Sequence, residues 1–258
     1  AVATVLSQAV SALWVVRFLR SEKSSLRLRK EYFRLDKRLL LPAIALGASP
    51  FIMQSTESLL TVTFNVSLQK YGGDLAVGAM TILTSVAQML QMPLLGLSQG
   101  AQPILSYNYG AKRADRMRQV VKYNLLISCV FAFGVWGLVQ GAPHLVAQLF
   151  NQDSALVDMT AWALRIYFAV GFTMAFQGTF QQCFVALGEA KISLFLALER
   201  KVILLIPLIL ILPHFLSDKL FAVFLAEPVA DFLAAATTTV LFLLRFRQIT
   251  RGLEQQSE

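Results

Sequence analysis

The apolar residues of this chain are gathered into seven long runs, separated by short polar connections. The runs cover residues 1–19, 39–68, 75–105, 120–141, 157–187, 192–212 and 219–244. An α-helix rises about 1.5 Å per residue, so roughly twenty residues span the ~30 Å hydrocarbon core of a bilayer. Each run is long enough to cross a membrane. The pattern therefore predicts an all-α fold, a polytopic membrane helix bundle with about seven transmembrane helices.

Composition supports the prediction of a membrane protein. Of the 258 residues, 56% are hydrophobic and only 15% are charged, whereas soluble domains carry about 25% charged residues. The net charge is +8, but the basic residues lie between the apolar runs and not along one folded face, so no nucleic-acid partner is expected. Cys129 and Cys183 fall in separate predicted helices, which argues against a disulfide framework and a metal site.

The basic residues also predict an orientation and a division into parts. Twenty of the 23 lie in alternate connections, around 17–38, 112–122 and 191–201 and after residue 244. Because Lys and Arg are retained on the cytoplasmic side, this alternation predicts a cytoplasmic C-terminus and an external N-terminus. The predicted parts are a transmembrane helix at 1–20, a basic cytoplasmic amphipathic linker at 21–38, a six-helix lobe at 39–246 and a cytoplasmic tail at 247–258.

Two parts at the start of the chain, the linker and the first apolar run, can each be interpreted in more than one way. The linker has apolar residues among its basic ones, which is typical of an amphipathic helix on the inner membrane surface. A solvated linker without such a helix explains the same pattern about as well. The chain starts without Met, a basic leader or a clear cleavage site. Its first run is therefore predicted to be a spanning helix of a longer protein and not a signal peptide.

One motif suggests an enzyme and has to be weighed. Gly96-Leu97-Ser98-Gln99-Gly100 fits the G-x-S-x-G pattern of a hydrolase nucleophile elbow, which needs a buried strand before the serine. The apolar segment before Ser98 is about thirty residues long, far beyond the ~4–8 residues of a buried strand. Ser98 is thus predicted on a membrane helix, and no catalytic residue is expected.

Carboxylates inside the apolar runs are the strongest candidates for function, because one near the bilayer centre costs about 2.5–3.5 kcal/mol on insertion scales. Glu57 lies in the middle of its run, with Gln54, Thr61 and Asn65 at steps of three and four residues. These steps place all four side chains on one helix face. A polar stripe of this kind is unstable against lipid, so it predicts a cavity or a contact with other helices.

Glu227 and Asp231 form a second acidic position. They are four residues apart with Pro228 between them, which makes them neighbours on a helix surface. Two close carboxylates disfavour double ionisation, so one is expected to bind a proton or to share a cation, as ion-coupled transport requires. A neutral acid that hydrogen-bonds a neighbouring helix, or a Glu227 wetted near the outer surface, remains an alternative.

The remaining polar and aromatic residues within the runs indicate a function less specifically than these carboxylates do. Gln181 and other glutamines within the runs more often join helices than bind ligands. Phe51 and Phe176 can line an adaptable apolar cavity or simply pack against other helices.

The run GLSQGAQPILSYNYGAK, from Gly96 to Lys112, resembles the end of the eighth helix and the following loop of multidrug and toxic compound extrusion (MATE) transporters, especially a bacterial exporter subgroup. Similar stretches occur at 71–80, 184–213 and 226–235. The resemblance implies twelve helices in two six-helix lobes. Residues 1–19 are similar to the sixth helix, and the other six runs are similar to the second lobe.

The resemblance also implies a function, namely secondary active multidrug efflux from the bacterial cell (inner) membrane. H⁺ or Na⁺ would exchange for cationic amphipathic drugs by alternating access, with no cofactor besides the coupling ion. On this interpretation Glu57, Asp231 and Glu227 couple the cation or proton. The substrate cavity is then expected to be lined by Gln54, Phe51, Asn65, Phe176 and Gln181. The stretch similar to the tenth helix, 167–188, holds no acid, a departure from the branch of the family that pairs a seventh-helix acid with a tenth-helix aspartate.

Other interpretations remain open. The chain could be a lipid-linked precursor flippase of the same superfamily, a seven-helix membrane sensor, or a fragment without activity of its own. The expected partners are membrane lipids, the drugs, and a missing N-terminal lobe or a second copy of the chain. An enzyme is least favoured, because no H-E-x-x-H motif or nucleophile–base pair occurs.

Overall fold

The computed structural model describes residues 2–21 and 37–255, and side chains between 37 and 54 lie outside this description. The amphipathic linker predicted for 21–38 falls almost entirely on residues that are not described. The chain divides into two units, 1–50 and 51–258. The first unit contains α1 (Val2–Arg20), which at 19 residues is about 28 Å long, and the beginning of α2 (Lys37–Gly110).

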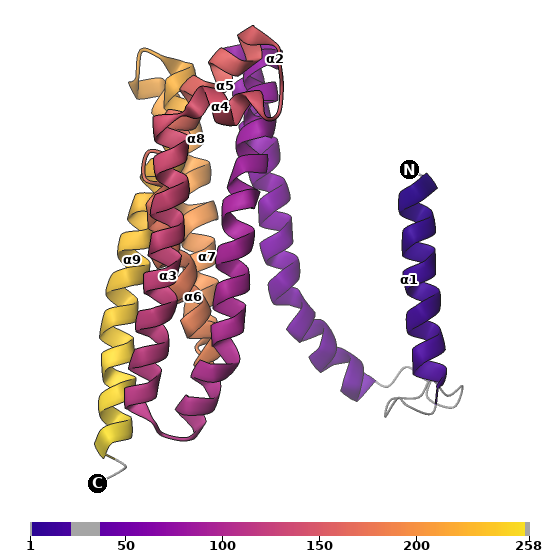
Figure 1. Cartoon of the computed structure of the whole chain (residues 1–258), viewed down its shortest axis with the longest axis vertical. Coiled ribbons are helices and arrows are strands. Elements are labelled where there is room, and N and C mark those ends of the chain that lie inside the picture. The colour runs from indigo at the N-terminus through magenta and orange to yellow at the C-terminus, as the bar shows by residue number, and fades with distance from the viewer. Residues whose placement is uncertain (1, 22–36, 256–258) are drawn as a thin grey trace. The chain divides into compact units, whose positions relative to one another are not determined.

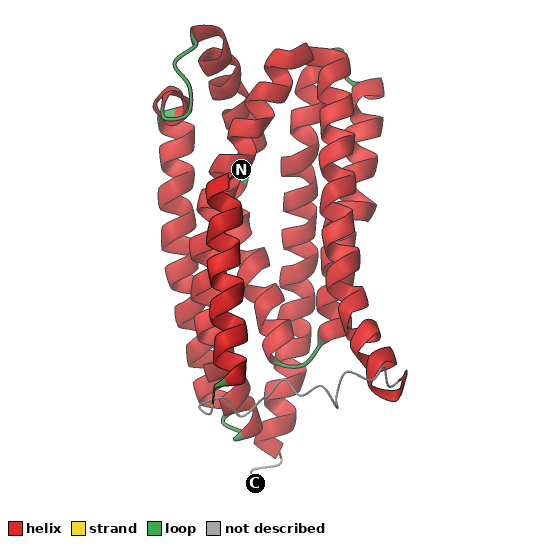
Figure 2. Ribbon diagram, turned by 90° about the vertical axis from the view of Figure 1, so that its right-hand side faces the viewer, coloured by secondary structure: helices red, strands yellow, loops and turns green. Residues whose placement is uncertain are grey.

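The second unit is built from helices packed lengthwise (Figures 1 and 2). After the rest of α2 it contains α3 (Ala114–Gly141), α4 (Pro143–Gln148), α5 (Ser154–Tyr167), η2 (Gly171–Thr173), α6 (Met174–Ala186), α7 (Ala190–Leu198), η3 (Glu199–Leu205), α8 (Ile206–Phe215) and α9 (Lys219–Gln255). No strand occurs among the residues described, and the all-α fold class is confirmed. The last helix continues through residues 247–255 of the predicted tail.

The predicted runs 39–68 and 75–105 are the two arms of α2. The chain reverses at Gly73, which has φ 64° and ψ −161°, a backbone conformation essentially confined to glycine. Within the second unit, Figure 1 shows α2 reversing its direction, so that its two arms run in opposite directions. The turn is tight, since a Cβ on Gly72 would lie 2.5 Å from Cβ of Ala76 and 2.7 Å from Cδ1 of Leu220. A glycine pair thus replaces a loop between the two arms.

Length and composition identify the segments that suit a membrane. Within the described residues, Ser55–Gly110, Ala114–Gly141 and Lys219–Gln255 are each long and apolar enough to cross, and the bent pair Ser154–Tyr167 and Gly171–Ala186 counts as a fourth if it forms one span. The first of these segments includes both sides of the Gly73 reversal. Ser98 lies within it, 3% exposed and in helical backbone, which confirms that the G-x-S-x-G motif is no nucleophile elbow.

The prediction of one helix over 157–187 was wrong. α5 ends at Tyr167, and the following η2–α6 segment is bent from it by 54°. Side chains of α3 bind the backbone oxygens that the break exposes. Gln140 Nε2 donates to the oxygens of Arg165 (3.1 Å) and Phe168 (3.0 Å), and Trp136 Nε1 donates to that of Ala169 (3.2 Å). A break inside an apolar segment is stable only when such partners replace the lost helical bonds.

Two apolar clusters hold the second unit together. The larger one joins both arms of α2 to α5, α8 and α9 through residues such as Leu68, Leu83 and Phe224. The smaller one joins the end of α2 to α3, α6, α7 and the last turns of α9. At its centre Phe242 stacks on Phe180 with ring centroids 4.3 Å apart. The charged groups described below lie on elements that these clusters fix in place.

Candidate functional site

The three acids identified from the sequence all pair with cations of η3, the π-helical turn Glu199–Leu205. The sequence analysis assigned Arg200 and Lys201 to a polar connection, and this assignment was wrong. Both residues lie inside a helical run formed by α7, η3 and α8 without interruption, so two of the twenty basic residues do not belong to a connection. Successive residues of a helix do not face each other. Arg200 accordingly reaches α9, whereas Lys201 reaches α2.

Arg200 pairs with both acidic residues of α9. Its Nε lies 2.6 Å from Oδ1 of Asp231, and its Nη2 lies 3.0 Å from Oε1 of Glu227. The side chains of Arg200, Glu227 and Asp231 are 14%, 5% and 2% exposed. These three residues, with Tyr167 of α5, are called the Arg200 cluster below. The sequence predicted that the two carboxylates bind a proton or share a cation, and in the structure they share the guanidinium of Arg200.

The Arg200 cluster carries one more acid than base. Tyr167, which is buried, lies within interaction range of Glu227, Asp231 and Arg200. Oε2 of Glu227 is buried and has no hydrogen bond of good geometry. With both acids ionised, the cluster has a net charge of −1 in the interior, where an uncompensated charge is costly. Either a proton or a second cation offsets this charge.

A second cation, Lys201, follows Arg200 in η3, and its ammonium forms an ion pair with Glu57 of α2. The Lys201 side chain is 19% exposed and that of Glu57 is 48% exposed. Thr61 and Asn65, which the sequence placed on the same face as Glu57, are exposed as well. Glu57 therefore lies on an accessible face of α2, and Asp231 is sealed inside the bundle.

Three of the five residues predicted to line a substrate cavity have side chains in the described part of the chain. The side chains of Phe51 and Gln54 lie outside the described part of the chain. Phe176 packs against Phe180 with ring centroids 6.4 Å apart, and the Gln181 amide donates to the backbone oxygen of Ser193 on α7 at 3.4 Å. Asn65 is exposed on α2. Phe176 and Gln181 thus have helix-packing roles within this unit.

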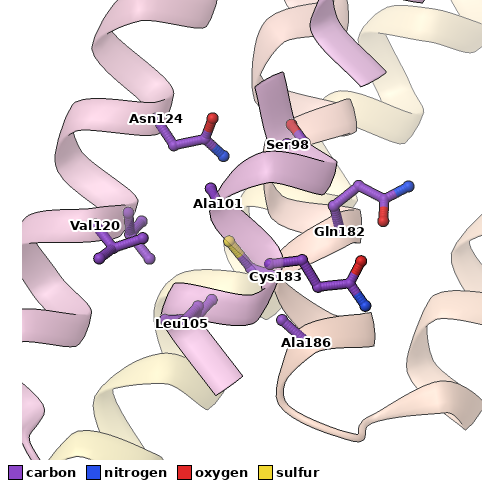
Figure 3. A pocket seen from close by; sticks show the side chains of 10 residues that line it. Ser98, Ala101, Leu105, Val120, Asn124, Gln182, Cys183 and Ala186 are labelled. Carbon is purple, nitrogen blue, oxygen red and sulfur yellow. The ribbon is translucent and has the colours of Figure 1, made fainter. Parts of the chain in front are cut away.

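Two small cavities occur in the second unit. One, shown in Figure 3, lies where α2, α3 and α6 meet, has a volume of about 10 Å³ and is lined by Ser98, Asn124 and Cys183 among others. The other has a similar volume and is lined by Thr56, Ala197, Leu198 and Lys201. Each has room for about one water molecule, whereas drug-sized ligands need roughly 300–1,000 Å³. No group of three or more metal-ligating side chains comes together among the residues described.

Sequence reasoning found the acids of this site and missed Tyr167, Arg200 and Lys201. One signal could have identified the two cations. Both fall inside the apolar run 192–212, where basic groups need acidic partners from neighbouring helices. Three intramembrane acids had already been identified, so pairing them with Arg200 and Lys201 was the simplest way to balance the charges.

Comparisons with known proteins extend this description. The sequence model of the MatE family matches residues 50–211. The multidrug export protein MepA of Staphylococcus saprophyticus is 22% identical over 253 residues, which cover 96% of this chain and 54% of that protein. The probable multidrug resistance protein YoeA of Bacillus subtilis is 24% identical, with 98% of this chain and 56% of that protein covered. The chain spans about half the length of these relatives.

Solved structures agree on the fold. An inward-facing multidrug resistance MATE family transporter superposes with a TM-score of 0.85 at 18% identity, covering 96% of this chain and 57% of that one. A MATE structure in the bent conformation superposes with a TM-score of 0.81 at 19% identity and covers 98% and 56% of the two chains. At these identities the likeness establishes the fold.

Proposed function

The chain belongs to the MatE family, and we propose that it forms the second lobe of a secondary active multidrug exporter in a bacterial cell membrane. Cationic amphipathic drugs would be exchanged for H⁺ or Na⁺ by alternating access between this lobe and a second one. The match to the family over residues 50–211 and the export function named for MepA support this proposal. The C-terminus would face the cytoplasm, as the distribution of basic residues predicts.

One observation carries the assignment to cation transport: the accessible carboxylate of Glu57, on a helix suited to crossing a membrane. An ionised acid at such a position is costly unless it binds a cation. Here the partner is a flexible lysine side chain, which a drug or a coupling ion can replace without unfolding a helix. The sealed Asp231 offers no comparable access, and we propose that it contributes to transport by holding Arg200 in place.

A transport assay tests this proposal on the protein as expressed from its own gene. Cells that lack other exporters should accumulate less tetraphenylphosphonium when they produce the wild-type protein. Glu57→Gln and Asp231→Asn should abolish this difference at equal protein levels in the membrane. Asp115→Asn is the control, because that side chain is 91% exposed at the start of α3. Normal efflux by both the Glu57 and the Asp231 variants would remove these residues from the mechanism, and a wild type indistinguishable from empty vector would refute the function itself.

A further inference from the structure

The start of α3 and the end of α9 meet at one end of the second unit. Arg118 of α3 pairs with Glu254 of α9 at 2.7 Å, and the neighbouring residues Met117 and Leu253 are buried in the same apolar cluster. The two helices run in opposite directions, since α3 begins where α9 ends (Figure 1). The bridge between Arg118 and Glu254 therefore fixes which residues of α3 lie level with which residues of α9.

Three more cations flank this bridge. Lys122 follows Arg118 by four residues, about 6 Å along α3. Arg251 and Arg247 precede Glu254 by three and seven residues, about 4.5 Å and 10.5 Å along α9. These spacings keep each cation on the same helix face as its bridge residue. All three are exposed, and within the described part of the chain none of them has an ion pair. The bridge and these three cations are called the basic seam below.

The same two helix faces become apolar further along. On α3, Leu126 and Val130 follow the last cation of the seam by four and eight residues, and on α9 Leu244 and Val240 precede the first cation by three and seven residues. All four are more than half exposed. Each helix thus carries cations near its end and exposed apolar side chains next to them on one face. A charged end followed by an apolar stretch matches the two parts of a phospholipid.

We infer that the basic seam binds the headgroup of an anionic phospholipid, whose acyl chains lie along the apolar faces of α3 and α9. Arginine and lysine form charge-assisted hydrogen bonds with phosphate oxygens. The acids beside the seam are Glu254 and Asp115, which lies 3.8 Å from Arg118, so four cations face two carboxylates and a net positive charge remains. A soluble phosphate would match this charge but leave the apolar faces uncovered, which favours the lipid as the occupant.

A lysine at the same end of the unit lies outside the seam and provides a comparison. Lys191 is exposed near the start of α7, two residues after Glu189, which lies 2.9 Å from Arg245 of α9. Arg245 and Glu254 are nine residues apart, which is two and a half turns of a helix with 3.6 residues per turn. Lys191 therefore lies beside the face of α9 opposite to the seam.

Native mass spectrometry of the purified protein, as expressed from its own gene and held in detergent, provides the test. Phosphatidylglycerol should bind about fivefold or more tightly than phosphatidylcholine, because a basic residue near the headgroup strengthens the attraction about fivefold. Lys122→Gln and Arg251→Gln should each weaken binding of phosphatidylglycerol about fivefold, and the double variant about 25-fold, with little effect on phosphatidylcholine. Added salt should reduce the preference. The melting temperature without lipid should not change, because both positions are exposed.

Lys191→Gln is the matched control, since it removes one exposed lysine from the same end of the unit and should leave lipid binding unchanged. An equal loss of affinity in Lys191→Gln and Lys122→Gln would overturn the inference, because the attraction would then be diffuse. Displacement of phosphatidylglycerol by an excess of glycerol 3-phosphate would also overturn it, because the site would then bind phosphate without the acyl chains. So would equal binding of the two lipids by the wild type. None of these results bears on the proposed export function.

Discussion

Replacing Arg200 by methionine should destabilise the protein strongly. The guanidinium is the only salt-bridge partner of Asp231 and Glu227 in the described part of the chain, and the two residues are 2% and 4% exposed. Removing one partner from a buried ion pair costs about 3–5 kcal/mol, because it leaves an uncompensated charge in the interior. For a chain of this size each kcal/mol lowers the melting temperature by about 2–4 °C. A decrease on the order of 10 °C is therefore expected.

Thermal unfolding in detergent or nanodiscs, followed by tryptophan fluorescence, measures this decrease. The triple variant Arg200→Met, Glu227→Gln, Asp231→Asn should recover most of the lost stability, because it removes the unpaired charges along with the arginine. Arg118→Gln is the control. Arg118 pairs with Glu254 at 2.7 Å, but both side chains are about half exposed, and such pairs contribute about 0.2–1 kcal/mol.

The reasoning fails if Arg200→Met lowers the melting temperature no more than Arg118→Gln does. It also fails if the triple variant is less stable than Arg200→Met alone. The first result would mean that the charge pairing in the Arg200 cluster contributes little to the stability of the fold. The second would mean that packing around the cluster matters more than its charge.

Three further variants test the fold. Gly73→Ala should cost about 1–3 kcal/mol through backbone strain alone, since no atom lies within 4 Å of the added Cβ, whereas Gly134→Ala in mid-helix should be neutral or stabilising. Phe242→Ala should cost about 3–5 kcal/mol by removing its stacking on neighbouring rings, and the exposed Leu243→Ala should change the melting temperature little. Gln140→Leu should leave the Arg165 oxygen without its side-chain donor, while the Phe168 oxygen keeps its bond from the Gly171 N–H. The expected cost is about 1–3 kcal/mol, and hydrogen exchange should accelerate at the break after α5 first.

The helices were predictable because a bilayer imposes length and polarity on every crossing segment. The breaks were not. Arg165 and Gly171 lie next to the break, but neither residue type by itself specifies one. The partners that make the break stable, Trp136 and Gln140, lie on α3 some 25 to 33 residues away in the chain. The reversal at Gly73 has a local signal in its glycine pair. Its geometry depends on the left-handed backbone of one residue, which sequence spacing does not determine.

The candidate site was also predicted only in part. Acids inside apolar runs are conspicuous because of their cost, so Glu57, Glu227 and Asp231 were identified as unusual. Their partners were missed, since Arg200 lies 31 positions from Asp231 and Lys201 lies 144 positions from Glu57. A net count of charges within the apolar runs predicts that pairs form. Which cation meets which acid follows only from the packing of η3 against α9 and α2.

The difference in exposure among the three acids argues for different roles. Asp231 is sealed and held by Arg200, so any ligand that reached it would first have to break a buried ion pair, at a cost of about 3–5 kcal/mol. Glu57 is half exposed and paired with a flexible lysine, so displacing this partner should cost less than breaking the buried pair of Asp231 and Arg200. Exchange during a transport cycle needs small barriers, so we expect ligands to exchange at Glu57. Asp231 then serves to fix Arg200, and through it the part of η3 from which Lys201 extends.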